Sequence, residues 1–272
     1  MKKERIDVLL VQQGLFETRE QAKRAVMAGE ILGENEERLD KPGMKVDPET
    51  KLHFKGTKMP YVSRGGLKLE KALKVFHLSI KDKTVLDIGS STGGFTDVAL
   101  QKGAKMSYAL DVGTNQLAWK LRQDDRVVVM ENTNFRYSKK DDFTSGQPDF
   151  ATIDVSFISL HLILPNLHSI IKEGGSVVAL IKPQFEAGRE KVGKHGIVHD
   201  PKTHLEVVQD IMAFSASVGY DVCELDFSPI TGGQVNIEFL IHLKSVDGEG
   251  KIMPEVDAAA VVKQAHAVLK HK

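Results

Sequence analysis

Hydrophobic and polar positions follow a short-period pattern over the first sixty residues. Apolar residues at helical spacing predict two short helices, one beginning near Arg5 and one after Thr18. Thr18 and Gln21 have the spacing of a capping box, in which two side chains satisfy free N–H groups at a helix start. Short apolar runs at residues 31–33 and 51–54 predict two strands. The pattern indicates a small α+β unit.

From residue 84 the pattern changes to apolar runs separated by amphipathic stretches. The runs predict strands at 84–88, 106–111, 127–131, 150–154, 176–182, 221–227 and 236–243. The amphipathic stretches predict helices at 94–102, 115–122, 159–171 and 203–218. Strands that alternate with helices form a doubly wound parallel sheet. The last two runs have no helix between them, so we expect them to pair antiparallel.

We therefore expect an α/β chain in four parts: a small α+β domain at 1–59, a linker and basic helix at 60–83, a sheet domain at 84–246 and a helical tail at 247–272. The basic helix region, residues 61–83, holds six lysine and arginine residues against two acidic ones. Leu69, Leu73 and Phe76 give its helix one apolar face.

Composition limits the class of protein. The chain has 272 residues, 41% of them hydrophobic and 27% charged, which excludes a disordered or fibrous protein. Its single cysteine excludes a disulfide framework and a cysteine-ligated metal site. No apolar run approaches a membrane span and the chain start lacks a signal-peptide core, so we expect a cytoplasmic protein. No metal-ligand spacing is evident in the sequence, so we expect no metal site. Because 37 basic residues balance 37 acidic ones, nucleic-acid binding requires a local patch.

A glycine-rich turn at residues 87–97 is the strongest local signal. An apolar strand leads into Gly89 and a helix follows from Gly94, an arrangement that exposes backbone N–H groups to a ligand. Neither the dinucleotide pattern nor the phosphate-loop pattern is present. Asp87 could pair with an ammonium group, and Asp111, at the end of the next strand, with ribose hydroxyls. This combination fits S-adenosylmethionine better than NAD; the alternative is a turn that binds nothing.

Several motifs resemble the hemolysin A/TlyA family of RNA methyltransferases. The turn reads Asp-Ile-Gly-Ser-Ser-Thr-Gly-Gly-Phe-Thr-Asp, and residues 63–69, 153–160, 180–186 and 196–198 match further family motifs. The wider FtsJ-type group often has Pro-Gly-Gly where this chain has Thr-Gly-Gly, a departure that matches the TlyA branch. The resemblance covers essentially the whole chain. It implies a Rossmann-like class I methyltransferase sheet preceded by an RNA-binding domain like that of ribosomal protein S-four.

The resemblance also implies a catalytic Lys-Asp-Lys-Glu tetrad, which falls by motif on Lys68, Asp154, Lys182 and Glu238. The predicted strands agree, because Asp154 and Lys182 each end a parallel strand, where catalytic groups gather. Glu238 lies early in the last predicted strand and reaches the same edge if that strand is antiparallel. Lys182 is the candidate base, or the group that stabilises the alkoxide, when a ribose 2′-hydroxyl is methylated. Singly, these residues also fit ordinary roles as a helix cap, a strand end or a solvated helix face.

The residues expected to bind S-adenosylmethionine are Asp87, Gly89, Ser90, Ser91, Thr92, Gly93, Gly94, Phe95, Asp111, Val112 and Asp154. The residues expected to bind RNA are Arg5, Arg19, Lys23, Arg24, Lys41, Arg64 and Lys71. A solvated charged helix is the alternative for the N-terminal members of this set. Base selection requires an extruded nucleotide, and the candidate stacking partners are Phe157, Phe185 and Tyr61.

We therefore expect a cytoplasmic, S-adenosylmethionine-dependent ribosomal RNA 2′-O-methyltransferase that acts on cytidine. Its expected partners are ribosomal RNA or ribosomal subunits. One alternative is a non-enzymatic ribosome-binding or assembly factor that keeps the cofactor pocket. Another is a membrane-active hemolysin, for which the sequence contains no strongly amphipathic apolar segment.

Overall fold

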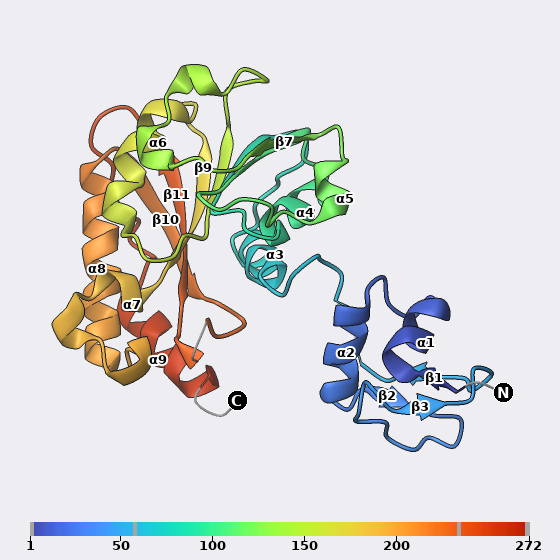
Figure 1. Cartoon of the computed structure of the whole chain (residues 1–272). Coiled ribbons are helices and arrows are strands. Elements are labelled where there is room, and N and C mark those ends of the chain that lie inside the picture. The colour runs from blue at the N-terminus through green and yellow to red at the C-terminus, as the bar shows by residue number, and fades with distance from the viewer. Residues whose placement is uncertain (1–2, 57–58, 233–234, 270–272) are drawn as a thin grey trace. The chain divides into compact units, whose positions relative to one another are not determined.

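The computed structural model describes residues 3–56, 59–232 and 235–269. The chain forms two compact units, Met1–Pro60 (unit 1) and Tyr61–Lys272 (unit 2) (Figure 1). Each unit has its own buried core, and each is described by itself below.

Unit 1 packs two helices with two short strand pairs. Its elements are β1 (Glu4–Arg5), α1 (Ile6–Gln12), α2 (Arg19–Met27), β2 (Ile31–Leu32), β3 (Lys45–Val46) and β4 (His53–Phe54). β1 pairs with β3 and β2 with β4, both antiparallel. Ile6, Val26 and Ile31 are buried in its core. The capping box is confirmed, because the Gln21 N–H donates to the Thr18 hydroxyl and the Thr18 N–H donates to the Gln21 side chain.

Unit 2 is built on a seven-stranded sheet in the order β10-β11-β9-β8-β5-β6-β7. Its strands are β5 (Thr84–Ile88), β6 (Met106–Leu110), β7 (Val127–Met130), β8 (Phe150–Ile153), β9 (Ser176–Ile181), β10 (Tyr220–Phe227) and β11 (Phe239–Ser245). β11 pairs antiparallel with β10 and β9, while β5 to β9 pair in parallel. The predicted fold class is confirmed. Because β5 lies between β6 and β8, the ligand crevice expected at a topological switch point falls at the carboxyl end of β5.

Helices cover both faces of this sheet (Figure 1). One face carries α3 (Gly66–Val75) and α4 (Gly94–Gln101), and the other carries α6 (Leu164–Ile170), α8 (Pro201–Ser217) and α9 (Ala258–Leu269). Side chains of β9 alternate between the two cores, so Val178 packs on the α3 side and Val177 on the α8 side. Two short helices are α5 (Trp119–Arg122) and α7 (Pro183–Glu186), and 3-10 turns occur at Phe135–Tyr137, Lys140–Asp142, Leu160–Leu162, Arg189–Lys191 and Lys194–Gly196. Within the described ranges, no helix is both long and apolar enough to cross a membrane.

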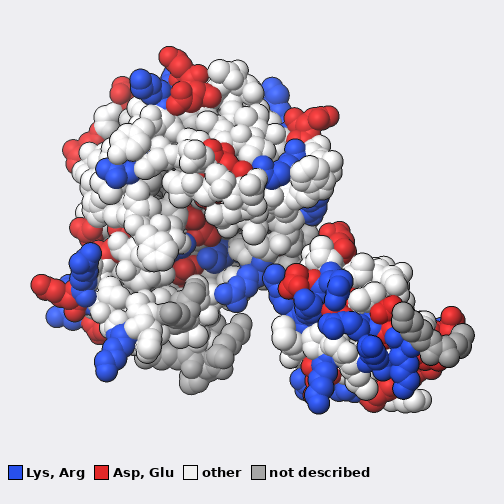
Figure 2. Space-filling view, viewed as in Figure 1, with Lys and Arg blue, Asp and Glu red and all other residues white. Residues whose placement is uncertain are grey.

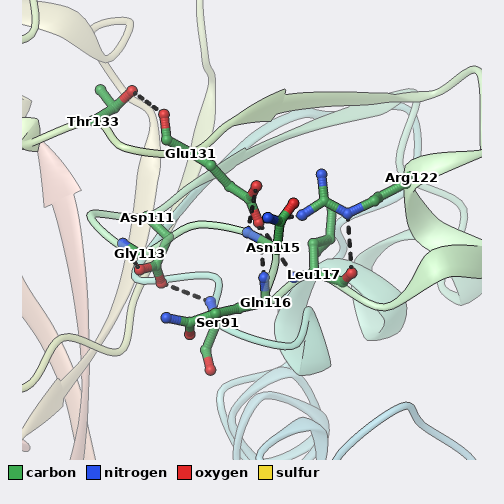
Figure 3. A network of polar contacts seen from close by, with 9 residues as sticks. All are labelled: Ser91, Asp111, Gly113, Asn115, Gln116, Leu117, Arg122, Glu131 and Thr133. Atoms are coloured by element: carbon green, nitrogen blue, oxygen red, sulfur yellow. Dashed lines mark hydrogen bonds and ion pairs between the residues drawn. The ribbon is translucent and has the colours of Figure 1, made fainter.

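The predicted helix at 115–122 is wrong over its first half. The N–H groups of Asn115, Gln116 and Leu117 donate to the Glu131 carboxylate at 2.9 to 3.3 Å (Figure 3). Asn115 also has a left-handed φ of +56°. The segment is therefore a loop around Glu131, and α5 begins only at Trp119.

Two other predicted elements are shorter than expected. The last strand begins at Phe239 instead of residue 236, because the Asn236 carbonyl accepts the Gly232 N–H in a loop. The helix predicted from residue 159 is divided into a 3-10 turn and α6, since the Ser159 hydroxyl caps the turn by accepting the His161 N–H. The later start leaves Glu238 directly before β11, and β8 and β9 end one residue before Asp154 and Lys182, so these three tetrad residues still lie at strand ends.

Candidate active site

The glycine-rich turn after β5 lies tightly against two other segments. Gly89 has a φ of +85°, and a Cβ there would lie 2.5 Å from the Asp154 carbonyl oxygen. At Gly94 a Cβ would lie 2.4 Å from the Ser63 hydroxyl oxygen and 3.0 Å from the Gly66 nitrogen. A larger residue at either position would displace its neighbour. The turn therefore contacts both the end of β8 and the loop that begins α3.

Asp87 holds this turn from inside the sheet. Its fully buried carboxylate accepts the Thr96 N–H at 3.1 Å, the Thr96 hydroxyl at 2.7 Å and the Thr152 hydroxyl at 2.9 Å. Burial raises the pKa of Asp87 to about 6, although the threonine donors favour the charged form. These contacts join β5 to α4 and β8, so the Asp87 carboxylate has protein partners where the sequence predicted a cofactor ammonium.

Asp111, directly after β6, is held by the same turn. One of its oxygens accepts the Ser91 N–H and the other accepts the Gly113 N–H, each at 2.7 Å (Figure 3). A carboxylate oxygen that accepts one hydrogen bond keeps a lone pair for another donor. Asp111 is partly exposed, and the neighbouring Val112 is 67% exposed. This strand end thus offers a fixed acceptor beside an uncovered apolar side chain.

The sheet brings three members of the predicted tetrad to one edge. Asp154 directly follows β8 and Lys182 directly follows β9, while Glu238 directly precedes the antiparallel β11. Phe239 pairs with Ile181, so Glu238 and Lys182 leave adjacent strands at the same level. The fourth member, Lys68, comes from the first turn of α3, which packs against the sheet beside the glycine-rich turn.

The four side chains form one chain of contacts. Lys68 Nζ lies 2.6 Å from Glu238 Oε2 and 3.6 Å from Asp154 Oδ2. Lys182 Nζ lies 2.5 Å from Asp154 Oδ1 and donates to the Ser156 hydroxyl at 3.2 Å. Burial disfavours the Lys68 ammonium, but Asp154 and Glu238 outweigh it and raise the pKa of Lys68. Two ammonium groups and two carboxylates therefore compensate one another in a largely buried cluster.

The tetrad lines a cavity of about 630 Å³. Seven of the predicted cofactor residues also line it: Gly89, Ser90, Ser91, Thr92, Gly94, Phe95 and Asp154. Four others lie outside its wall: Asp87, Gly93, Asp111 and Val112. The remaining wall comes from residues 63–65, 156–157, 184–185, 195–196, 230–232 and 236. The cavity is thus bounded by the glycine-rich turn on one side and by the charged cluster on another.

Two polar residues that the sequence analysis did not single out take part in this cavity. Ser156 accepts a hydrogen bond from Lys182, and this role could have been suspected because Ser156 lies within the family motif at residues 153–160. Asn236 is 3% exposed; its Oδ1 accepts the Val198 N–H at 3.1 Å and its Nδ2 donates to the Gly196 carbonyl at 2.9 Å. Asn236 therefore holds the 196–198 loop beside the segment that carries Glu238.

The three aromatic side chains proposed for base stacking differ in exposure. Phe157 is 91% exposed and has a left-handed φ of +62°. The Phe157 and Phe185 rings are 4.9 Å apart, and both residues line the cavity. Tyr61 is buried, and its hydroxyl donates to Glu70 at 2.6 Å. Only the two phenylalanines are therefore placed to meet a base that enters the cavity.

The basic residues predicted to bind RNA in unit 1 have different surroundings. Arg5 and Arg19 flank the buried Asp7, at 2.8 and 2.9 Å. Lys23 lies 2.6 Å from Glu20, and two more basic residues, Arg24 and Lys41, are exposed. Lysine and arginine side chains are frequent on the visible face of unit 1, with acidic side chains among them (Figure 2).

The two RNA-binding candidates of unit 2 also differ. Arg64 is exposed and lines the cavity. Lys71 Nζ instead lies 3.0 Å from Asp226 and donates to the Phe227 carbonyl at 2.6 Å, with the Phe227 ring centroid 3.7 Å away. Lys71 therefore joins α3 to the end of β10, whereas Arg64 stands at the cavity wall.

Comparison with known proteins relates both units to described families. Residues 61–245 match the FtsJ-like methyltransferase family, and residues 4–52 match the S4 domain. The chain is 64% identical over 273 residues to YqxC of Bacillus subtilis, provisionally named an rRNA methyltransferase, covering 100% of this chain and 97% of that protein. It is 37% identical over 250 residues to the 16S/23S rRNA (cytidine-2′-O)-methyltransferase TlyA of Mycobacterium tuberculosis, covering 90% and 91% of the two chains.

A solved structure gives the same relationship. A protein of Streptococcus thermophilus, provisionally named a hemolysin, matches with a TM-score of 0.80 and 60% sequence identity, covering 100% of this chain and 98% of that chain. Three findings agree. The family match covers unit 2, the S4 match lies in unit 1, and the relatives named above align with nine tenths or more of the sequence. The chain belongs to the FtsJ-like methyltransferase family, in the TlyA branch that carries an N-terminal S4 domain.

Proposed function

We propose that this chain is an S-adenosylmethionine-dependent ribosomal RNA 2′-O-methyltransferase that acts on cytidine. The observation that carries this assignment is the contact chain from Glu238 through Lys68 and Asp154 to Lys182 at the wall of one cavity. The related TlyA of Mycobacterium tuberculosis is named for cytidine-2′-O methylation of 16S and 23S rRNA. A buried cluster of two lysines and two carboxylates can hydrogen-bond a ribose hydroxyl and accept its proton, and methylation of the ribose requires both.

The residues around the turn fit S-adenosylmethionine. Gly89 and Gly94 leave no room for side chains, so the backbone of the turn is what lines the cavity there. Asp111 keeps acceptor capacity for ribose hydroxyls, and Val112 offers apolar surface to the adenosine part. Asp87, which is fully buried and outside the cavity wall, would shape the turn through its threonine contacts without touching the cofactor.

The tetrad would act on the ribose hydroxyl. S-adenosylmethionine, when bound, supplies a methyl group on positively charged sulfur: the S–C bond breaks, an O–C bond forms and the hydroxyl proton leaves. Asp154 holds Lys182 Nζ at the cavity wall, where it can take that proton or donate to the oxygen as negative charge grows. Lys68, fixed between Asp154 and Glu238, holds the Asp154 carboxylate in place. Catalysis would rest on this positioning as well as on proton transfer.

Substrate RNA would be held at two levels. The S4 domain, with exposed Arg24 and Lys41, would dock structured RNA through its phosphates. Arg64 at the cavity wall would bind the backbone of the target nucleotide. The exposed Phe157 ring, next to Phe185, would stack on the extruded cytosine.

Tritium transfer from S-adenosylmethionine tests the assignment. The purified full chain is incubated with small subunits, large subunits and free ribosomal RNA, and the labelled RNA is digested with alkali. Label retained in an alkali-stable dinucleotide identifies a methylated ribose. Absence of label on every substrate, with cofactor bound in calorimetry, would overturn the assignment and favour the assembly-factor alternative.

Two substitutions at Lys182 separate its possible roles. Lys182→Ala removes both proton acceptance and hydrogen bonding, so we expect about a 10²- to 10⁴-fold lower transfer rate. Lys182→Arg keeps a donor but cannot take a proton near neutral pH. Residual transfer by Lys182→Arg well above that of Lys182→Ala would identify a charge-stabilising role, whereas equal loss would identify proton acceptance.

A further inference from the structure

A second groove, of about 820 Å³, lies beside the proposed active site. It is lined by Leu67, Glu70, Lys71, Leu73, Lys74, Leu78, Ser79, Ile80, Lys102, Pro229 and Ile230. Ile230 lines both this groove and the catalytic cavity. Lys68 lines the cavity, and Lys71, one helical turn later on α3, lines the groove. The two spaces are therefore neighbours along α3.

The free charge of the groove is positive. Its one carboxylate, Glu70, accepts a hydrogen bond from the neutral Tyr61 hydroxyl and keeps its single negative charge. Lys71 is occupied by Asp226, so it contributes little free charge. Lys74 and Lys102 are exposed and form no ion pair with any residue that the structure describes. Two ammonium groups without an ion-pair partner thus outnumber the one carboxylate of the groove lining.

The apolar lining of the groove alternates with these charges. Leu67, Leu78 and Ile230 are each partly exposed, so they present hydrocarbon surface within the groove. A single-stranded polynucleotide presents the complementary pattern, because its phosphates are anionic and its bases have apolar faces. A purely acidic peptide would pair with the lysines but has no apolar surface to place against Leu67, Leu78 and Ile230.

We propose that this groove binds the single-stranded RNA that flanks the methylated nucleotide, with Lys74 and Lys102 on its phosphates. The proposal rests on the proposed function, since the occupant is the substrate of the neighbouring cavity. The sequence predicted Arg64 and Lys71 as the RNA contacts of unit 2. Because Lys71 is paired with Asp226, the proposal assigns the second contact to Lys74 and Lys102, which form no ion pair in the described structure. Chain entering the cavity past Ile230 would continue along α3 in this groove.

The test is the double variant Lys74→Ala/Lys102→Ala in the full chain. Neither side chain has an ion pair in the described structure, so the fold and cofactor affinity should be unchanged in thermal melting and calorimetry. We expect the KM for free ribosomal RNA to rise about tenfold with kcat retained. For binding of a twelve-residue oligocytidine, the slope of log K against log salt should become shallower by about 1.4, or 0.7 for each lost phosphate contact on a single strand.

A matched control is Lys263→Ala, which removes an exposed lysine from α9 and should change neither value. If the double variant keeps the KM and the salt slope of the wild type, the groove proposal is overturned. The proposed function would still stand in that case, provided that the wild type transfers methyl groups. A defect seen with ribosomal subunits but absent with free RNA and oligocytidine would also overturn it, because the groove would then meet a protein surface. Absence of methyl transfer by the wild type, with oligocytidine binding still weakened, would instead reject the proposed function.

Discussion

The Lys68 ammonium and the Glu238 carboxylate lie 2.6 Å apart although 170 residues separate them in the chain. Glu238 is 2% exposed and Lys68 is 7% exposed, so neither charge is solvated. Asp154, at 3.6 Å from Lys68, is the next carboxylate in the cluster. The contact therefore ties α3 to the last strand of the sheet and fixes the proposed tetrad as one unit.

Glu238→Gln should weaken both stability and activity. The change keeps the side-chain size but leaves buried Lys68 with Asp154 as its remaining carboxylate partner. We expect the free energy of unfolding in urea to fall by about 1–3 kcal/mol and single-turnover methyl transfer to fall by about 10² or more. Adding Lys68→Met should cost less than the sum of the single changes, since the buried ammonium is then gone. Wild-type stability and transfer in Glu238→Gln would show that the pair supports neither.

Glu131 should control cofactor affinity without touching the cofactor. Its carboxylate accepts three consecutive N–H groups of the loop after β6 and pairs with Arg122 (Figure 3). Hydrogen bonding from Arg122 lowers the pKa of Glu131 to about 2, so this anchor stays charged. In Glu131→Gln the loop that follows Asp111 loses part of its anchor. We expect S-adenosylmethionine to bind about tenfold more weakly, with the transfer rate at saturating cofactor within about twofold of wild type.

A nearby ion pair provides the control for this experiment. Asp124 binds Arg126 at 2.7 Å in the same β6–β7 connection but does not hold the loop that follows Asp111. Asp124→Asn should leave the calorimetric affinity for S-adenosylmethionine unchanged. Equal affinity losses in Glu131→Gln and Asp124→Asn would mean that any weakening of this connection matters, and the specific role of Glu131 would be rejected.

Some of these contacts could be predicted from the sequence and others could not. The position of Asp154 and Lys182 at the sheet edge could be predicted, because a polar residue at the end of a parallel strand lies at that edge. The family motif then added Lys68 and Glu238 to the tetrad. The loop at 115–118 could not be predicted, because helical spacing says nothing about a carboxylate fifteen residues later that captures its N–H groups. The ion pair between Lys71 and Asp226 could not be predicted either, because 155 residues separate the two side chains in the chain. The local sequence pattern predicts helices, strands and the residues at the edge of the sheet. Ion pairs between residues far apart in the sequence determine which charged side chains stay unpaired, and the pattern does not predict these pairs.

A buried histidine should make unit 2 sensitive to mild acid. His204 Nε2–H donates to the Val198 carbonyl at 3.0 Å, and its Nδ1 faces His266 Nε2 of α9 at 2.8 Å. Burial, together with His266, lowers the pKa of His204 to about 4. The folded state therefore favours neutral His204, so its contribution is complete above pH 6.5 and is lost as pH falls toward 4. We expect about 2 kcal/mol of stability to be lost between pH 6.5 and 5.

The measurement is the melting temperature of unit 2 at pH 7 and pH 5. The wild type should lose about 4–8 °C from this group. His204→Gln keeps a donor and an acceptor but does not titrate, so it should lose less. His77→Asn, at an exposed histidine after α3, should behave as the wild type. An acid-induced drop of wild-type size in His204→Gln would contradict the prediction.

Asp7 should make unit 1 sensitive to stronger acid than His204 makes unit 2. Its buried carboxylate accepts hydrogen bonds from Arg5 at 2.8 Å and Arg19 at 2.9 Å, and these bonds, the one from Arg5 above all, lower the pKa of Asp7 to about 2. The folded state thus favours the carboxylate, so its stabilisation is present above pH 4 and is lost as pH falls through 2. Asp7→Asn should make residues 3–56 exchange amide hydrogens faster near neutral pH and should flatten the decline in their protection between pH 4 and 2. Asp40→Asn, at an exposed carboxylate of the same unit, should keep the wild-type decline; an equally steep decline in Asp7→Asn would show that another group causes it.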